Sequence, residues 1–219
     1  MILIASALAQ DCPAPTREDY VGHWAGGGTG ALVLAPDGTL LTVDAFRTFG
    51  AKGSDPAIEV GTWSFTDGGV VTAEGSPPLA FEGCERDTWL TSSRSPSWEP
   101  LSEDTVKAWA AAWSGAKTDF DSYGDWYGWD AFKSGEVHGA DAWLADKKTK
   151  VTKAECLEVR VDDVRIVDAH KAVFTQTYVS DRYCDVGEKT LTFFPMPARW
   201  VIVEETQPTA EPCPERCKP

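Results

Sequence analysis

The chain has 219 residues, of which 42% are hydrophobic and 11% aromatic, so it is long and apolar enough for one large or two small folded domains. Its formal net charge of −14 and its pI near 4.6 argue against binding nucleic acid or an anionic membrane surface through a positive field. No segment is apolar over the length that a membrane-spanning helix needs, so we expect no stable membrane insertion.

The first segment, residues 1–10, resembles part of a secretory signal. It reads M-I-L-I-A-S-A-L-A-Q, and Ala7-Leu8-Ala9 has the small-x-small pattern of a cleavage site. The usual positive region is missing and the apolar run is short, so we interpret it as a remnant or truncated signal. An apolar N-terminal strand is the alternative. The signal interpretation predicts a secreted or periplasmic protein.

Six cysteines make an even number, which fits disulfide bonds in an oxidising compartment. They are Cys12, Cys84, Cys156, Cys184, Cys213 and Cys217. Zinc is the rival interpretation, but only the last two cysteines are close together, and no histidine lies near them. We therefore expect disulfides, and neither a metal nor a cofactor.

Residues 11–98 are predicted to form a small antiparallel β domain, a partial barrel or meander. Strand patterns flank Asp37-Gly38 within 31–43 and Asp67-Gly68 within 61–73, as expected for two hairpins. Gly-x-Trp followed by a strand and a D-G turn is similar to the opening of lipocalin-like β domains. That resemblance covers about residues 20–92.

The composition changes near 92–101, and the hydrophobic period then becomes helical. An apolar stripe at Val106, Trp109, Ala110 and Trp113 predicts a helix that begins after Ser102 as N-cap. Aromatic residues predict a second short helix near 120–127. Ala140, Trp143 and Leu144 predict a third helix, capped by Gly139 or Asp141.

Four strands follow, at about 155–167, 172–183, 188–195 and 199–205, where the period is two. Three helices followed by four antiparallel strands predict an α+β domain over residues 99–207, with the helices packed on a curved sheet. Residues 208–219 form a tail rich in Pro and Cys.

The order of motifs in this half resembles a known family. W-A-A-A-W at 109–113, F-T-Q-T-Y-V-S at 174–180, K-T-L at 189–191 and R-W-V-I-V-E-E at 199–205 occur in sequence. The run over about 103–206 is similar to the nuclear transport factor two-like (cystatin-like) domain appended to bacterial cell-envelope L,D-transpeptidases. The resemblance implies a cone, a bent sheet wrapped around helices, that acts as a non-catalytic binding or dimerisation module.

The catalytic unit of those transpeptidases is missing from this chain. It requires Ser-x-Gly-Cys, whereas the nearest stretch reads Glu82-Gly83-Cys84-Glu85-Arg86 and has no Ser at the required place. A cone-fold enzyme would instead need an internal general base. Its candidates are Asp119, Asp121, Asp125 and His138, and we interpret all four as solvated surface. We expect no catalytic residues.

Strand register predicts one disulfide. If 155–167 turns at 168–171 into 172–183, Cys156 faces residue 183 or 184, which favours a Cys156–Cys184 bond. Local twist, or a bulge at Asp162-Asp163, would close the remaining distance. For the others we favour Cys12–Cys84 and Cys213–Cys217. The alternative is a tail that reaches back to the β domain.

The strand at 172–183 has two mixed faces. With a three-residue loop, Val164 and Ile166 lie opposite Gln176 and Phe174. Phe174, Gln176 and Tyr178 then face the helices, and Val173, Thr175, Thr177 and Val179 face outward; a two-residue loop would invert this. A buried Gln176 would bond to Tyr123 or Tyr127, or it would face a wet pocket.

These patterns predict pocket residues without naming the ligand. W-Y-G-W at 126–129 is either a packed corner or an aromatic surface for sugar rings. The candidate ligand-binding residues are Tyr123, Trp126, Tyr127, Gln176 and Tyr178. We expect a non-enzymatic envelope module that binds peptidoglycan or a small ligand. The alternatives are a cone-fold isomerase or hydrolase, and a structural homodimer that uses the outward Val/Thr face.

Overall fold

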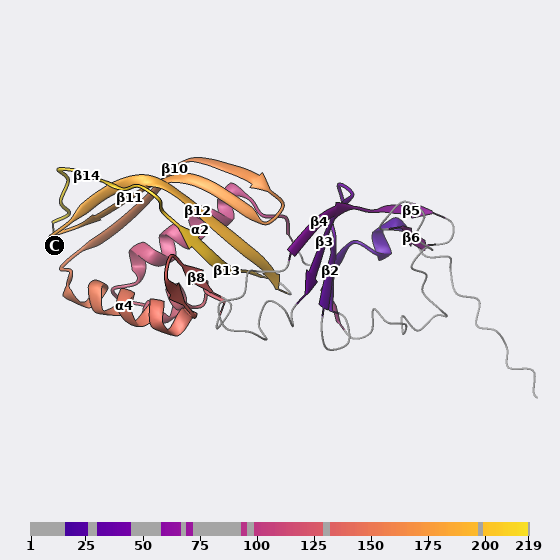
Figure 1. Ribbon diagram of the computed structural model, residues 1–219, viewed down its shortest axis with the longest axis horizontal. Helices are drawn as coiled ribbons and strands as arrows, with labels where there is room; N and C mark the ends of the chain where they lie inside the picture. The colour runs from indigo at the N-terminus through magenta and orange to yellow at the C-terminus, as the bar shows by residue number, and fades with distance from the viewer. Residues whose placement is uncertain are drawn as a thin grey trace, which may run out of the picture.

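The computed structural model describes residues 16–25, 30–44, 58–66, 69–71, 93–95, 99–128, 132–196 and 199–218. The signal-like segment 1–10, Cys12, Cys84 and the stretch 82–86 lie outside these residues, so the predictions made for them stay predictions. Two sheets and the helices packed on the second account for most of the described chain, and the sheets follow one another along the long axis of the molecule (Figure 1).

The N-terminal sheet is antiparallel, with strand order β4-β3-β2-β1-β7. Its strands are β1 (Gly22–Ala25), β2 (Gly30–Leu34), β3 (Thr39–Asp44), β4 (Ile58–Thr62) and β7 (Ser93–Ser95). A 3₁₀ turn, Arg17–Asp19, precedes β1, and β5 (Ser64–Thr66) pairs with β6 (Gly69–Val71). Both predicted hairpins are confirmed. Gly38 has φ of 94°, the left-handed conformation that glycine adopts without strain, in the turn between β2 and β3.

The three predicted helices are confirmed. Helix α2 (Glu103–Gly115) begins after Ser102, whose hydroxyl accepts a hydrogen bond from Thr105 N at 3.4 Å. Its predicted stripe is buried. Helix α3 (Phe120–Gly124) is capped by the carboxylate of Asp119, and α4 (Ala140–Lys153) begins after Gly139, the predicted alternative to Asp141.

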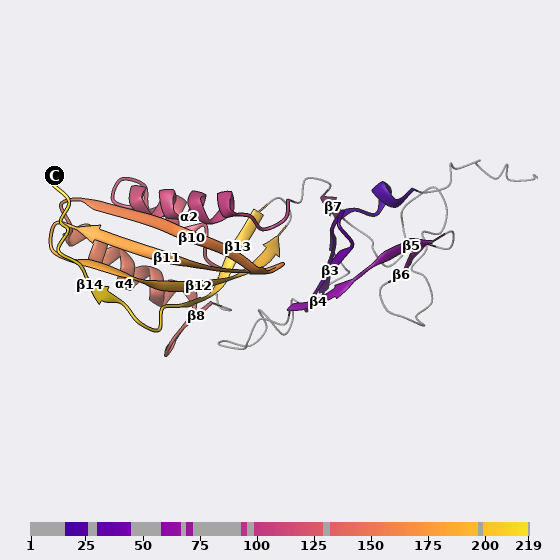
Figure 2. The same cartoon turned by 90° about the horizontal axis from the view of Figure 1, so that it is seen from above.

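The C-terminal sheet confirms the predicted α+β architecture. Its long antiparallel strands are β10 (Leu157–Asp168), β11 (Lys171–Ser180), β12 (Cys184–Met196) and β13 (Arg199–Thr206). Short strands complete it: β8 (Lys133–Ser134) runs parallel to β13, β9 (Val137–His138) pairs with β8, and β14 (Glu211–Pro212) pairs with β12. The sheet bends over the helices (Figures 1 and 2).

One buried apolar cluster fills the space between the helices and this sheet. Trp109 and Trp113 of α2 pack with Phe174 of β11 and Phe193 of β12. The same cluster includes Val33 and Leu41 of the N-terminal sheet, so the two sheets share buried contacts. Tyr20, Trp24 and Trp63 belong to a separate core under the first sheet.

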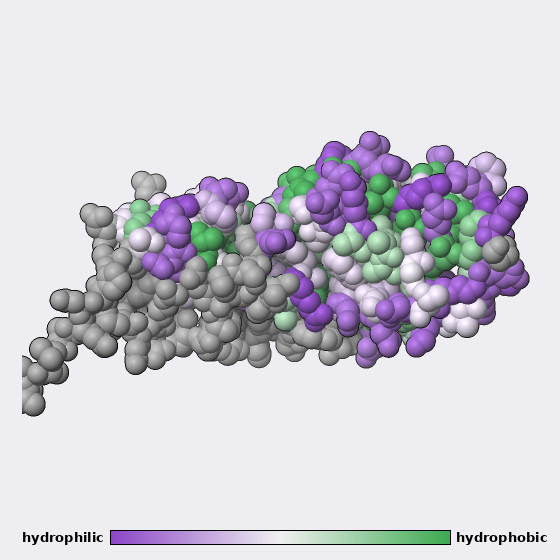
Figure 3. All heavy atoms as spheres, turned by 180° about the vertical axis from the view of Figure 1, so that it is seen from behind, coloured by the Kyte–Doolittle hydropathy of each residue, from purple (hydrophilic) through white to green (hydrophobic). Residues whose placement is uncertain are grey.

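The surface of the described chain is largely polar. Hydrophilic residues are interspersed with apolar patches on the face in Figure 3. The large apolar side chains exposed among the described residues are Val60, Ile166, Val167 and Tyr183. Over the same part of the chain, no helix combines the length and apolar character needed to cross a membrane.

The predicted orientation of β11 is confirmed, although its predicted register is wrong. Phe174 lies 5.7 Å from Trp109, and Tyr178 lies 5.7 Å from Trp113, between ring centroids, so this face meets the helices. Gln176, however, pairs with Val161 and not with Val164. The hairpin turns over two residues and not the predicted three, since Asp168 pairs with Lys171. Register shifts between Ile166 and Asp168 and between Asp162 and Arg165, where Asp163 has φ of 53°, move the pairing further.

The predicted Cys156–Cys184 and Cys213–Cys217 bonds are wrong. The structure pairs Cys156 with Cys217 and Cys184 with Cys213, with Cα–Cα distances of 6.0 and 5.1 Å. Two features account for the difference. The two-residue turn and the two register shifts make Leu157 pair with Ser180, and β11 ends at Ser180, which puts Cys184 on β12 beside Val179. One strand therefore separates the two cysteines.

Both bonds hold residues 207–218, here called the C-terminal strap, against one end of the sheet. The strap bonds to β12 through Cys213, and Glu215 pairs with Arg160 of β10 at 2.5 Å. It packs so closely on Gly187 that an added Cβ there would lie 3.1 Å from Ala210 Cα. The strap returns to the C-terminal sheet, whereas the alternative prediction sent the tail to the β domain.

Candidate functional site

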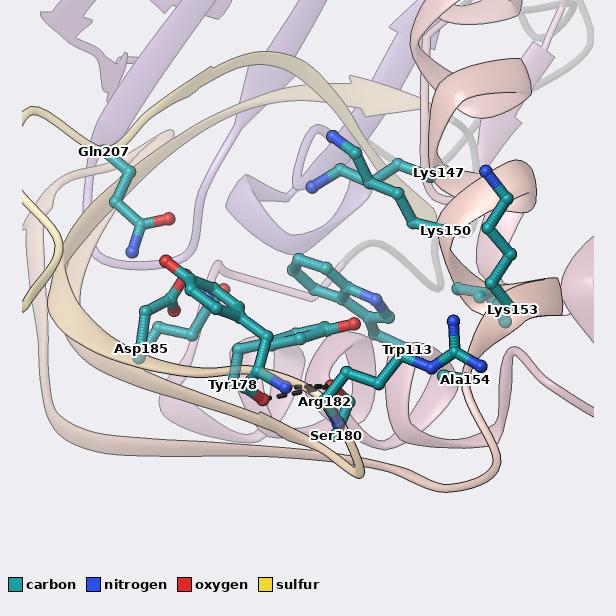
Figure 4. Close-up of a pocket in the computed structure, with 13 residues that line it drawn as sticks. Trp113, Lys147, Lys150, Lys153, Ala154, Tyr178, Ser180, Arg182, Asp185 and Gln207 are labelled. Atoms are coloured by element: carbon teal, nitrogen blue, oxygen red, sulfur yellow. Dashed lines mark hydrogen bonds between the residues drawn. The ribbon is translucent and has the colours of Figure 1, made fainter. Parts of the chain in front are cut away.

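A cavity of about 510 Å³ opens between α2, α4 and the ends of β11 to β13 (Figure 4). Its lining residues are Trp113, Lys147, Lys150, Val151, Lys153, Ala154, Gln176, Tyr178, Ser180, Arg182, Tyr183, Asp185 and Gln207. They come together because inward-facing residues of the sheet meet the last turns of α4 at this end of the cone. We call it the mouth cavity.

The mouth cavity is aromatic on one side and cationic on the other. Trp113 and Tyr178 pack together, with Tyr183 next to Tyr178 at 6.4 Å between ring centroids. Three lysines of α4 and Arg182 supply four cationic groups, against Asp185 as the one carboxylate among the lining residues; outside the lining, Asp146 pairs with Lys150 and Asp181 with Arg182. A chain of net charge −14 therefore carries a local site that attracts anions.

Several buried polar atoms of this cavity have no protein hydrogen-bond partner among the described residues. They are Trp113 Nε1, Gln176 Oε1, Asp185 Oδ1 and Gln207 Nε2. Gln176 is only 2% exposed, and leaving such a group unpaired costs about 1–3 kcal/mol. Buried polar groups of native proteins are nearly always bonded, so these atoms are suited to bond to a ligand or to water.

A buried ion pair lies deeper in the cone. Lys189 Nζ donates to Glu205 Oε1 at 2.5 Å, and the Tyr127 hydroxyl donates to Glu205 Oε2 at 3.0 Å. The hydroxyls of Tyr123 and Tyr127 are 2.7 Å apart, and Trp109 Nε1 donates to Tyr127 at 3.3 Å. Burial raises the pKa of the Glu205 carboxyl, but attraction to Lys189 and Lys147 outweighs burial and holds that pKa below its ordinary value.

Lys147 lies between the ion pair and the cavity. Its Nζ is 4.5 Å from the ring centroid of Trp113 and 4.2 Å from that of Trp143. Burial lowers the pKa of Lys147 to about 8; Glu205 raises it, and Lys189 and Lys150 lower it further. The folded protein therefore holds this amine much closer to neutrality than an exposed lysine.

Lys147→Met is expected to raise the free energy of unfolding by about 1–3 kcal/mol at pH 7, because the folded state then no longer buries an ammonium group. In the folded protein Lys147 loses its proton near pH 8, whereas in the unfolded chain it keeps the proton to about pH 10.5. The free energy of unfolding of the natural chain therefore increases as the pH rises from about 8 to 10.5. The stability that Lys147→Met adds should therefore disappear by about pH 10.5. Urea unfolding at pH 7, 8.5 and 10 measures it.

Lys148→Met is the matched control for that substitution, because Lys148 is the exposed neighbour on α4. Its effect should stay within about 0.5 kcal/mol at each pH, as for most surface changes. An effect of Lys147→Met that did not change with pH would contradict the predicted ionisation of Lys147.

The structure distributes the five predicted pocket residues over three places. Gln176 and Tyr178 line the mouth cavity. Tyr123 and Tyr127 are buried in the Glu205 network: the Tyr127 hydroxyl bonds to Glu205 and to the Tyr123 hydroxyl. One prediction had instead placed Gln176 as their partner. Trp126 lines a separate cavity of about 470 Å³ with Asp104, Asp125 and Arg199 among its residues.

Sequence reasoning missed the charged groups of the site. Lys189 and Glu205 are inward-facing residues in strands that are otherwise apolar on that side, beside Leu191 and Ile202. The available signal was a charged residue at a strand position that faces inward. Lys147 and Arg182 gave no signal, because lysine on a helix and arginine in a turn are ordinary surface residues.

The predicted surface assignment of three acidic residues is confirmed, since Asp119, Asp121 and Asp125 are exposed. Asp119 also accepts hydrogen bonds from Ser122 as the cap of α3. His138 lies in β9. Among the described residues, no group of three or more His, Cys, Asp or Glu side chains could hold a metal ion.

No family model and no curated protein matches the chain. Solved structures do. Bd1075 of Bdellovibrio bacteriovorus is 26% identical with a TM-score of 0.42, over 47% of this chain and 38% of that protein. The helical cell shape determining protein Pgp2 of Campylobacter jejuni (K307A mutant) is 17% identical with a TM-score of 0.40, over 46% and 37%.

A third match is an NTF-2 like protein of unknown function from Shewanella oneidensis, 19% identical with a TM-score of 0.38, over 48% of this chain and 96% of that protein. NTF-2 like is the resemblance that the sequence predicted for about residues 103–206. This chain spans less than two fifths of Bd1075 and Pgp2.

Proposed function

We propose that the protein is a non-enzymatic binding module that acts outside the cytoplasm and takes an anionic ligand in the mouth cavity. The observation that carries this proposal is the cavity itself, where four cationic side chains, an aromatic wall and unpaired buried polar atoms meet. Peptidoglycan is the envelope component we propose as ligand, because its peptides end in carboxylates.

The side chains of the cavity can bind both the carboxylate and the amide groups of such a ligand. Carboxylates would pair with Arg182 and the lysines of α4, and charge-assisted hydrogen bonds of this kind are about twice as strong as neutral ones. Amide groups would bond to Gln176 and Gln207, whose free atoms include one acceptor and one donor. Tyr183 is 50% exposed and offers a flat apolar surface beside them.

The state of the internal carboxylate supports a role without catalysis. A general base must reach the proton that it removes. Both oxygens of Glu205 are already bonded, to Lys189 and Tyr127, and its side chain is 3% exposed. The cone-fold enzyme remains the alternative, and it would need this network to open.

The disulfides of the described chain fit an oxidising compartment, since such bonds seldom persist in the cytosol. A homodimer through the outer sheet face remains the third candidate. The C-terminal strap changes where that interface could form, because Val179 is only 2% exposed and Cys217 Sγ lies 3.9 Å from its carbonyl oxygen. Val173, Thr175 and Thr177 would have to supply the contact.

Pelleting with purified peptidoglycan tests the proposal, and Arg182→Ala is expected to weaken retention about tenfold, as for loss of one charge-assisted contact. Arg165→Ala is the matched control, because Arg165 is also exposed and paired with a carboxylate, Glu188 at 2.9 Å, but lies outside the cavity. Salt should weaken binding of the natural chain. No retention of the natural chain, or equal losses for the two variants, would contradict the proposal.

A further inference from the structure

Lys147 is placed like a reactive group, with access from two cavities. It lines the mouth cavity and also a second cavity of about 400 Å³, whose wall includes Trp143, Glu205 and Gln207. In Figure 4 the side chains of Lys147 and Lys150 extend from α4 toward the opposite wall, where Gln207 lies. The amine is thus at the junction of two spaces that a small molecule could enter.

The surroundings of Lys147 do not supply an ion pair. No carboxylate of the described residues lies within 4 Å of its Nζ; the nearby Asp146 pairs with Lys150 at 2.6 Å, and Glu205 pairs with Lys189 at 2.5 Å. The charged groups that act on it are Asp146 and Lys150 of α4, Lys189 of β12 and Glu205 of β13. Two of these are cations, and two indole rings cover the amine.

We propose that Lys147 is a nucleophilic amine that forms a reversible imine with an aldehyde or keto compound bearing an anionic group. Lysines become nucleophilic when they are desolvated or lie beside another cation, and Lys147 meets both conditions. The inference goes beyond the proposed peptidoglycan binding and does not depend on it, because a small carbonyl compound can probe the amine directly.

The step balances without any co-reactant. The neutral Nζ attacks the carbonyl carbon: a C–N bond forms, the carbonyl π bond breaks, and one Nζ proton moves to the oxygen to give a carbinolamine. The C–O bond then breaks and the oxygen leaves as water with the second Nζ proton, which leaves the C=N bond with no net oxidation or reduction. Trp113 Nε1 is an unpaired donor in the same cavity and would bond to the oxygen while it carries negative charge.

The anionic group of the ligand follows from the rest of the lining. Lys150, Lys153 and Arg182 stand at the same cavity as Lys147, so a carboxylate or phosphate would be attracted to them while the carbonyl group reaches the amine. The carbon skeleton that joins the anionic group to the carbonyl group would lie against the aromatic wall of Trp113, Tyr178 and Tyr183. A 2-oxo acid or an acidic aldehyde has this pattern.

The ionisation of Lys147 supports the same chemistry. With a pKa of about 8, it holds roughly 300 times more neutral amine at pH 7 than a lysine of ordinary pKa 10.5. Glyoxylate should therefore select it over the exposed lysines, and the rate should rise with pH and level off above about pH 8.

Reductive trapping tests the proposal. The full chain is incubated with glyoxylate and cyanoborohydride at pH 7, and peptide mapping by mass spectrometry locates the carboxymethyl groups. Lys147 is expected to be labelled at least tenfold faster than Lys148, its exposed neighbour. Lys147→Arg should remove the fast phase, while Lys148→Arg leaves it unchanged. Near-UV circular dichroism checks that each variant is folded.

A neutral aldehyde, propionaldehyde, separates nucleophilicity from recognition of the anion. Arg182→Ala should slow labelling by glyoxylate several-fold and leave labelling by propionaldehyde unchanged. Equal labelling of Lys147 and Lys148, or a fast phase that persists in folded Lys147→Arg, would overturn the proposal. A fast phase at Lys147 in a chain that does not bind peptidoglycan would uphold this inference and contradict the proposed function alone.

Discussion

Glu205→Gln is expected to lower the free energy of unfolding by about 3–5 kcal/mol, the largest effect of any single change considered for this protein. The substitution keeps the shape of the side chain but removes its charge. It leaves the Lys189 ammonium, 1% exposed, without the carboxylate that now accepts its hydrogen bond at 2.5 Å. Chemical denaturation at pH 7 measures the loss.

The matched control is Glu204→Gln, one residue earlier on β13. Glu204 is half-buried and pairs with Lys133 at 3.2 Å, an arrangement typically worth less than about 1 kcal/mol. Similar losses of unfolding free energy for both variants would show that the buried charge of Glu205 is not the cause of the loss. The double variant Lys189→Met, Glu205→Leu should lose less than Glu205→Gln, because no charge is then left unpaired.

The same pair predicts an acid sensitivity. Because folding lowers the pKa of Glu205, its contribution is fully present above the unfolded value of 4.5 and is lost as the pH falls through the lower folded value. The difference in stability between the natural chain and Glu205→Gln should therefore narrow as the pH falls below 4.5. A difference that stayed constant down to pH 2 would contradict this ionisation.

Removal of either described disulfide is expected to lower the free energy of unfolding by about 2–4 kcal/mol, the range typical of such bonds. Cys156 and Cys217 are 61 residues apart, and Cys184 and Cys213 are 29 apart. In the chain-entropy account, the longer loop gives the larger loss. Paired Cys→Ser variants, Cys156→Ser with Cys217→Ser and Cys184→Ser with Cys213→Ser, measure the two effects by urea unfolding.

Loss of the Cys184–Cys213 bond should also free part of the sheet, because the strap pairs with Asp185 and Val186 of β12. Hydrogen exchange at these amides should speed up, while exchange at Phe193, in the middle of the core, stays slow. Non-reducing peptide mapping is the control for connectivity. A Cys156–Cys184 peptide in that map would contradict the pairing described here.

The sequence was informative where local chemistry decides the structure. The stripe that includes Val106, Trp109 and Trp113 predicted α2, and Ser102 predicted its start, because both signals depend on residues within a few turns. Alternation in 172–183 predicted the inward face of β11, including the buried Gln176. Of the predicted pocket residues that line the mouth cavity, Gln176 is the one that has a buried atom without a hydrogen-bond partner among the described residues.

The same reasoning failed where residues far apart in the chain decide. The bulge near Asp163 shifts the register of β10 against β11, and the end of β11 at Ser180 moves Cys184 to the next strand. The two cysteines of the tail then bond at one end of the sheet, one beside the start of β10 and one at the start of β12. Register errors of this kind arise because a small slip costs little locally and is decided by packing of the whole face.

The sequence by itself determined the α+β class, the three helices, the inward face of β11 and an even set of cysteines, because period, capping and composition are local properties. Only the tertiary structure decided which charges the cone encloses. Lys147, Lys189 and Glu205 come from three different elements, and burial sets their ionisation only after those elements have packed together. The reactive character proposed for Lys147 is therefore a property of the folded cone.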